Sequence, residues 1–237
     1  MPQPPAPLLH KMPKVNPVWL MGFVGVALVA GLYGGQYIER SRTVTPQTKV
    51  QHALQALESG YDKNALAILK PLADAGNPKA QYWLADIYEN GLGVKSDMTT
   101  SVALLEKSAA QGFLPAERHL GGLYLKGNET LQNFGKAQTW LHKAAVSGSG
   151  EAQRELGHIY ALGLGVAADR PEAYAWYENA ALSGDGLAKY MRDDILTRMS
   201  PAEIAKGEQD ARDVAGDIKS AKPDAKAVAG NTKPAKP

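Results

Sequence analysis

One segment of this chain occurs three times, at a fixed spacing of 36 residues. The copies read YENGLGVKSD at residues 88–97, YLKGNETLQN at residues 124–133 and YALGLGVAAD at residues 160–169. A period of roughly 20–50 residues is typical of repeat arrays, in which each unit packs mainly against its neighbours. The chain is therefore expected to form an array of similar units.

Each unit is predicted to contain two helices, one before and one after the repeated segment. Apolar residues recur at helical spacing in both helices. The equivalent positions are Leu84, Leu120 and Leu156 in the first helices, and Leu105, Leu141 and Tyr177 in the second helices. The residue after each first-helix leucine is small, which lets a neighbouring helix come close: Ala85, Gly121 and Gly157.

The repeated segment is predicted to be the turn between the two helices, because its glycines adopt positive φ without steric cost. Asp97 and Asp169 are expected to cap the second helices, and Glu172 to complete a capping box with Asp169. Glycines at equivalent positions are expected to end the second helices: Gly112, Gly148 and Gly184.

The pattern Leu-Ala/Gly-x-x-Tyr-x-x-Gly-x-Gly-Val-x-x-Asp, followed by Trp-Tyr-x-x-Ala-Ala-x-x-Gly, resembles the Sel1-like repeat, a relative of the tetratricopeptide repeat. Residues 156–184 match it closely, and residues 84–112 match except at Leu104 and Leu105. The resemblance covers about residues 50–188. It implies an all-α fold, a right-handed α-solenoid of Sel1-like, TPR-like helical hairpins that serves as a protein-interaction scaffold.

The middle copy departs from this pattern. Glu129, Thr130 and Asn133 stand where Gly, Val and Asp occur in the pattern, although the length of the unit is unchanged. The geometry of this turn is therefore open, and it is the one place where the motif itself could have been altered for a partner.

A helical pair at residues 49–59 and 62–75 is predicted to be a degenerate first unit, because Gly76 lies 36 residues before Gly112. A helix near residues 189–198 continues the first-helix position after the third unit.

Ser200 and Glu203 form a capping-box pattern for a polar helix of about three turns, ending near Ala215, which is expected to cap the array. The array with its cap is assigned to residues 49–216. Residues 217–237, rich in Lys, Ala and Pro, are expected to be disordered.

The N-terminal part has a different character. Residues 1–16 are proline-rich and expected to be disordered. Residues 17–38 carry no charge and are long enough to span a hydrocarbon core of ~30 Å. We predict a single transmembrane helix here, joined to the array by a linker at residues 39–48. A cleaved signal peptide is the alternative, although the candidate cleavage site near residues 29–31 is weak.

Ala27, Gly31 and Gly35 recur every four residues in the predicted transmembrane helix. Such a stripe favours close packing against another membrane helix, although glycine is also common in membrane helices in general. Basic residues are nearly balanced on its two sides. The short N-terminal flank favours a signal-anchor, so we expect a single-pass protein of the bacterial inner membrane with a periplasmic array; a cytoplasmic array is the remaining possibility.

The residues of the chain give little sign of chemistry. There is no cysteine, and the histidines lack the spacing of a zinc site. We therefore expect no enzyme activity, no cofactor, no metal and no small-molecule substrate. Residues 51–217 carry a net charge of −6, because the two ends carry +4 each in a chain of +2. An acidic array is a poor nucleic-acid binder.

Residues that differ between equivalent first-helix positions, and are not needed for packing, are candidates for partner binding. Stacked units place such positions along one face, the inner face of the solenoid if the Sel1 geometry holds. Aromatic residues and arginines often dominate binding energy. For Trp83, packing against the helix at residues 62–75 is an equally good explanation. The candidates are Tyr82, Trp83, Asp86, Arg118, His119, Gly122, Arg154, Glu155, His158 and Tyr190.

These features predict a membrane-anchored scaffold for protein–protein interaction, an accessory or assembly subunit of a membrane or cell-envelope complex. The alternative is a cell-wall or β-lactam-related enzyme or enzyme regulator, by analogy with cysteine-rich Sel1-like proteins. This chain lacks their cysteines and has no Ser-x-x-Lys pair.

Overall fold

The structure, a computed structural model, describes residues 45–127 and 132–221. The chain divides into two units between Thr48 and Lys49. The fold described below is that of the second unit.

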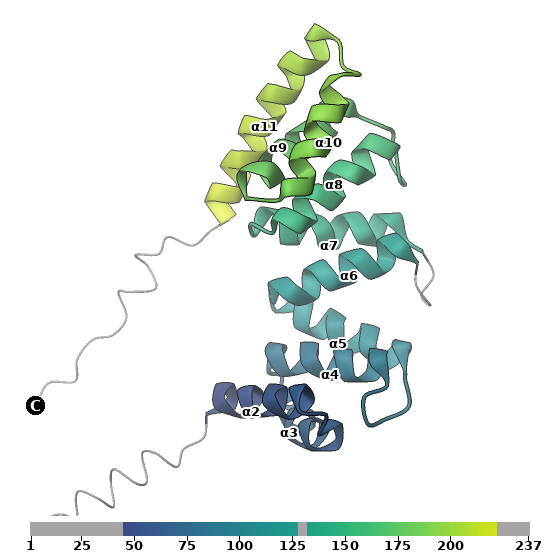
Figure 1. The fold of residues 1–237 in the computed structure, drawn as a ribbon, viewed down its shortest axis with the longest axis vertical. Helices are drawn as coiled ribbons and strands as arrows, with labels where there is room; N and C mark the ends of the chain where they lie inside the picture. Colours follow the sequence, from purple (N-terminus) through teal and green to yellow (C-terminus); the bar gives the residue numbers. More distant parts are fainter. Residues whose placement is uncertain (1–44, 128–131, 222–237) are drawn as a thin grey trace, which may run out of the picture. The chain divides into compact units, whose positions relative to one another are not determined.

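The described residues form helices in consecutive pairs, which follow one another in chain order (Figure 1). The predicted all-α solenoid is confirmed. The pairs are α2 (Pro46–Glu58) and α3 (Asp62–Asp74), α4 (Pro78–Asn90) and α5 (Met98–Ala110), α6 (Leu114–Lys126) and α7 (Phe134–Val146), α8 (Gly150–Leu162) and α9 (Arg170–Leu182), and α10 (Gly186–Leu196) and α11 (Pro201–Ala221).

The predicted N-caps of the second helices are present, but one predicted capping box is not. Asp97 caps α5, and Asp169 Oδ1 accepts a hydrogen bond from the Glu172 amide at 3.0 Å. The Glu172 carboxylate does not bond back to the Asp169 amide. That amide already donates to the Tyr160 carbonyl at 2.9 Å, and Glu172 accepts from Trp176 Nε1 at 2.8 Å. The turn supplies the bond that a capping box would have made.

In the described part of the middle turn, the hydrogen bonds that start the second helix are the same as in the next unit. Glu129 and Thr130 lie outside the described residues. Asn133 caps α7 by accepting from the Lys136 amide at 2.9 Å, and its own amide donates to the Tyr124 carbonyl at 3.0 Å. These are the bonds that Asp169 makes in the next unit, so asparagine replaces aspartate here without loss of the cap.

Small residues set the distance between the helices of a pair, as predicted. A Cβ atom added to Gly157 would lie 2.5 Å from the Tyr177 ring, and one added to Gly121 would lie 2.5 Å from Leu141 Cγ. Both partners are buried. The second helix therefore rests directly on the backbone of the first.

The last helix, α11, packs on α9 and not on its own predecessor α10. The Asn179 side chain donates to the Ala211 carbonyl at 3.0 Å, and Gly207 lies close to the Tyr174 ring. Ser200 and Glu203 form the predicted capping box at 2.8 and 3.3 Å. The expected cap is thus present, but it covers α9.

The sequence of α10 explains this placement. In α8, Gly157 lies against Tyr177 of the second helix, and Gln153 and Leu156 are buried. The equivalent residues of α10 are charged: Lys189, Arg192 and Asp193. Another helix cannot pack closely on this surface, because burying the charged side chains would be unfavourable. The array therefore ends at α10.

Some helix bounds differ from those predicted. Helix α2 begins at Pro46, before residue 49, and α11 continues past Ala215 to Ala221. Residues 217–221, expected to belong to the tail, are therefore helical. Ile218 packs against the hydrophobic core, which extends the helix beyond its predicted end.

The N-terminal predictions fall largely outside the described residues. These include the proline-rich residues 1–16 and the transmembrane helix at residues 17–38, with its small residues Ala27, Gly31 and Gly35. Within residues 45–127 and 132–221, no helix combines the length and the apolar character needed to cross a membrane.

Candidate partner-binding face

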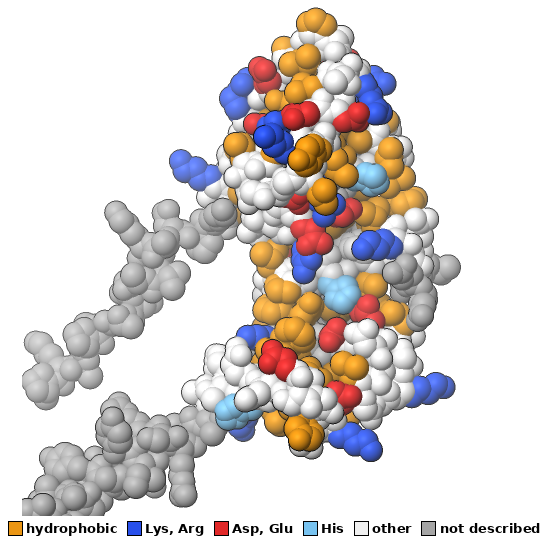
Figure 2. Space-filling model, viewed as in Figure 1, with side chains coloured by type: hydrophobic (Ala, Val, Ile, Leu, Met, Phe, Trp, Pro, Cys, Tyr) orange, Lys and Arg blue, Asp and Glu red, His pale blue; other side chains and the backbone are white. Residues whose placement is uncertain are grey.

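The candidate residues lie on the first helices α4, α6, α8 and α10, in three sets of equivalent positions. Tyr82, Arg118, Arg154 and Tyr190 form the first set, Trp83, His119 and Glu155 the second, and Asp86, Gly122 and His158 the third. None of these side chains is fully buried. In Figure 2, basic, acidic and histidine side chains lie among apolar ones over these helices. The surface formed by the three sets is named the first-helix face.

A polar pocket of about 330 Å³ opens on this face between α4 and α6. His119 Nε2 lies 3.1 Å from Glu89 Oε2 and joins the two helices. The Tyr82 ring stands edge-on to His119 at 6.0 Å and to Phe113 at 5.5 Å. Lys126 lines the same pocket. The structure therefore brings Tyr82, Arg118, His119 and Gly122 together around one pocket.

Two carboxylates, Asp86 and Glu89, lie near each other on α4, and Glu89 lines the polar pocket. Burial raises the pKa of the Asp86 carboxyl, and the neighbouring Glu89 raises it further, against opposing effects of His119 and of the Asn90 amide. Burial also raises the pKa of the Tyr82 hydroxyl. A further anion beside Asp86 and Glu89 would be unfavourable.

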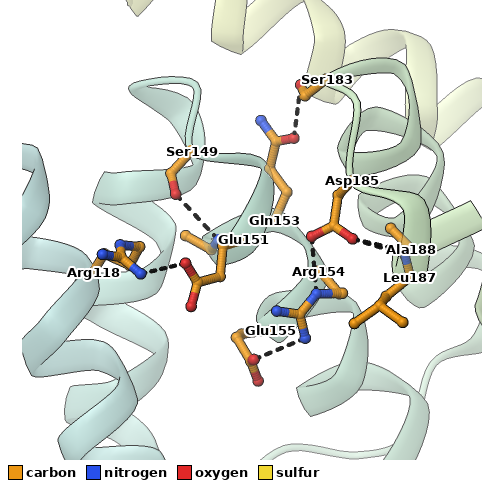
Figure 3. Close-up of polar contacts among 11 residues, drawn as sticks. Arg118, Ser149, Glu151, Gln153, Arg154, Glu155, Ser183, Asp185, Leu187 and Ala188 are labelled. Carbon is orange, nitrogen blue, oxygen red and sulfur yellow. Dashed lines mark hydrogen bonds and ion pairs between the residues drawn. The ribbon is translucent and has the colours of Figure 1, made fainter.

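Ion pairs link the two arginine candidates, Arg118 and Arg154, to the next first helix or to its cap (Figure 3). Arg118 on α6 pairs with Glu151 on α8. Arg154 Nε lies 2.9 Å from Asp185 Oδ2, and its Nη1 lies 3.0 Å from Glu155 Oε1.

Asp185 has a second role, because its other oxygen accepts from the first amides of α10 at 3.0 Å. The Arg154 side chain is only 17% exposed. Arg154 therefore links α8 to the cap residue of α10, and Glu155 pairs with Arg154 on the same helix. That these two residues contact a partner stays a prediction.

A second pocket, of about 380 Å³, lies between α8, α9 and α10 and is named the apolar pocket. His158 and Tyr190, both predicted candidates, line it. Tyr177 forms part of its wall, and burial raises the pKa of that hydroxyl to about 12, so that it stays protonated. The sequence analysis did not select the remaining lining residues: Ala161, Leu162, Arg170, Met191, Asp194, Ile195 and Arg198.

A repeat comparison carried further would have pointed to Leu162. It stands where the preceding unit has Lys126, so an apolar residue replaces a charged one at a surface position. Arg170 begins a second helix and Arg198 follows α10. No first-helix pattern could have selected them.

Trp83 lies elsewhere. It packs, partly buried, against the core shared by α2, α3 and α4. Its ring contacts Tyr82 edge-on at 5.2 Å. The packing explanation that the sequence left open therefore accounts for Trp83, and we do not include it in the first-helix face from here on.

The first-helix face presents aromatic, basic, acidic and histidine side chains. Within residues 45–127 and 132–221, no cluster of His, Asp and Glu has a geometry that could hold a metal ion. Arg118 and His119 pair with carboxylates of neighbouring first helices, and Arg154 pairs with the cap residue of α10.

The comparisons with known proteins agree with the repeat assignment. Residues 78–113, 114–149 and 150–185 match the family model of the Sel1 repeat, so these three units are Sel1 repeats. No curated protein matches the sequence. Sel1 repeat proteins act as protein–protein interaction scaffolds, and the fold is typically not catalytic.

Several solved structures match this chain, among them the following two. A Sel1 repeat protein from Oxalobacter formigenes is 32% identical, with a TM-score of 0.59 over 65% of this chain and 46% of that chain. The protective antigen c5321 of uropathogenic Escherichia coli, described as having an SLR fold, is 22% identical, with a TM-score of 0.46 over 83% of this chain and 50% of that chain. The chain thus matches about half the length of each of these proteins.

Proposed function

We propose that this protein is a membrane-anchored scaffold that binds a protein partner on its first-helix face, as an accessory or assembly subunit of a membrane or cell-envelope complex. One observation carries the proposal. Most buried positions of the three repeats are alike, whereas one position on the surface changes from Tyr82 to Arg118 and Arg154 and back to Tyr190. A binding surface adapted to one partner requires surface residues that differ between repeats, held by a core that stays the same.

Two further features of the sequence support the membrane part of this proposal. Residues 17–38 are mostly apolar, carry no charge and have the length of a membrane span. Ala27, Gly31 and Gly35 would let this span pack against a helix of the partner complex. We place the anchor in a bacterial inner membrane and the array in the periplasm. Reporter fusions after Lys49 and at the C-terminus test this orientation, and a cytoplasmic signal from both would contradict it.

The experiment on partner binding is affinity purification of the full chain from membranes in mild detergent. We expect a partner in a fixed ratio to the chain. Lys126→Glu should release it, because Lys126 lines the polar pocket and a new carboxylate there would face Glu89. Lys107→Glu is the matched control: it also changes an exposed lysine in the last turn of a helix, but on the second helix α5. Recovery of the chain alone would contradict the proposal.

A further inference from the structure

The apolar pocket lies beside an exposed hydrophobic surface. Leu162 on α8 is 59% exposed, and Leu187 and Tyr190 on α10 are 61% and 74% exposed. Leu187 and Tyr190 are three residues apart and so lie on the same side of their helix. Exposed apolar clusters of this kind mark interaction sites when charged groups surround them.

Two arginines stand at the rim of this pocket. Arg170 lies 3.5 Å from Glu203, and Arg198 lies 2.8 Å from Asp194. Both arginine side chains are more than half exposed. Exposed ion pairs contribute little, so either guanidinium can exchange its partner for a carboxylate of a ligand at small cost. A guanidinium can bind such a carboxylate through two parallel hydrogen bonds.

The two arginines at the rim of the apolar pocket are a local exception in an acidic array. Residues 51–217 are acidic as a whole, with a net charge of −6. The apolar pocket is lined by Arg170 and Arg198 against one carboxylate, Asp194, whereas the polar pocket is lined by Arg118 and Lys126 against two, Glu89 and Glu151. Lys126 stands one repeat before Leu162, at the equivalent position. An acidic ligand is therefore favoured at the apolar pocket and disfavoured beside Glu89.

We propose that the apolar pocket binds a segment of the partner protein in which an apolar side chain is flanked by carboxylates. The apolar side chain lies against Leu162, Tyr190 and Met191, and the carboxylates pair with Arg170 and Arg198. This inference rests on the proposed scaffold function and names the chemistry of its partner. The C-terminal residues 222–237 of the chain itself do not have this chemistry, because they carry four lysines and one aspartate.

The test measures fluorescence anisotropy with the full chain in mild detergent and a fluorescein-labelled peptide that has one phenylalanine between two aspartates. Replacing the aspartates by asparagines, or the phenylalanine by serine, should each weaken binding about tenfold, the effect of losing one anchor contact. Equal affinity for the asparagine peptide would overturn the proposal.

Variants of the chain locate the site. Tyr190→Ser and Leu162→Lys should each weaken binding about tenfold; the second introduces the residue that the preceding unit already carries. Tyr61→Ser is the matched control, since Tyr61 is also an exposed tyrosine but lies between α2 and α3. An equal loss in Tyr61→Ser would overturn the proposal. Circular dichroism melting must show that each variant is folded.

Reversing one charge of the pocket gives a second test, which still applies if one of the variants above folds poorly. Arg198→Glu should bind the aspartate peptide more weakly and a lysine-flanked peptide more tightly than the wild type does. A wild-type dimer that Tyr190→Ser dissociates would overturn the proposal, because a second copy would then cover the pocket. Higher peptide affinity after deletion of residues 222–237 would overturn it as well, because that segment would be the occupant.

The failure of this inference differs from failure of the scaffold function. If the purified chain still recovers its partner when Tyr190→Ser is introduced, the scaffold function stands and the pocket assignment is wrong. If the chain recovers no partner but binds the aspartate peptide at the apolar pocket, the pocket chemistry stands and the scaffold function fails.

Discussion

Glu117 occupies a position at which the units before and after it have glutamine. Gln81 and Gln153 are buried and donate to the carbonyls of Ala73 and Ala145 at 3.2 and 2.9 Å. Glu117 is equally buried, and its Oε2 is without a hydrogen-bond partner among the described residues. A carboxylate cannot make the bond that the glutamine amide makes. Burial raises the pKa of the Glu117 carboxyl, against the effect of Lys143.

Glu117→Gln is therefore expected to stabilise the array at neutral pH, by about 1–3 kcal/mol, because it removes an unsatisfied buried group and restores a donor. A carboxyl whose pKa is raised by folding costs no stability below its unfolded pKa. Stability is lost as the pH rises from there through the folded pKa. The advantage of Glu117→Gln should therefore shrink in acid. Urea unfolding of the full-length wild type and variant, at neutral and at acid pH, measures the difference in their free energies of unfolding.

The reverse change, Gln153→Glu, is the control for this prediction. It places the same carboxyl in the equivalent buried site and should destabilise the array at neutral pH. If Glu117→Gln leaves the free energy of unfolding unchanged at neutral pH, burial of Glu117 Oε2 without a hydrogen bond does not destabilise the array, and the prediction is wrong.

At the scale of helices, two adjacent glycines of α6 have opposite roles. A Cβ at Gly121 would lie 2.5 Å from Leu141 Cγ, whereas a Cβ at Gly122 would meet nothing within 4 Å. Gly121→Ala should destabilise the fold by about 1–3 kcal/mol, because the buried Leu141 has to move. Gly122→Ala should stabilise it by up to about 1 kcal/mol, because alanine favours a helix. Thermal unfolding separates the two, and a loss in both would show that α6 tolerates no side chain there.

The repeat predicted the helices well because the features that define them are local. Packing residues, caps and turn glycines recur every 36 residues, and each acts within its own unit. The sequence could not show how separate elements pair. Asp185 binds Arg154 from a loop, as the cap of α10, so no first-helix comparison connects the two. Leu162, Arg170 and Arg198 form one pocket from three separate segments, and their proximity depends on the stacking of the units.

The placement of α11 has a similar origin. Its capping box and its polar pattern predicted a terminal cap, and both are local signals. Which helix it covers depends on the surfaces available, and α10 offers Lys189, Arg192 and Asp193 where α9 offers Tyr174 and Asn179.

At the scale of the whole array, the hydrophobic core consists of two clusters that meet at α4. The N-terminal cluster joins α2, α3 and part of α4, and its fully buried large side chains are Val50, Leu69 and Ile87. The second cluster extends from α4 to α11 and includes Trp176 and Tyr177. In a solenoid each unit is stabilised by its neighbours only, so an end unit with a small core opens more readily than an inner unit.

Hydrogen exchange of the full chain should therefore show earlier opening of α2 and α3. Their amides are expected to have protection at least about tenfold lower than those of α8 and α9, a difference of about 1.4 kcal/mol in opening free energy. The opposite end should not open in this way, because α11 closes the second cluster through Gly207, Ala211 and Val214. Truncation before α11 is the matched perturbation: it should lower protection in α9 and leave α2 and α3 unchanged. One common protection factor for all helices would show that the two clusters unfold as a single unit.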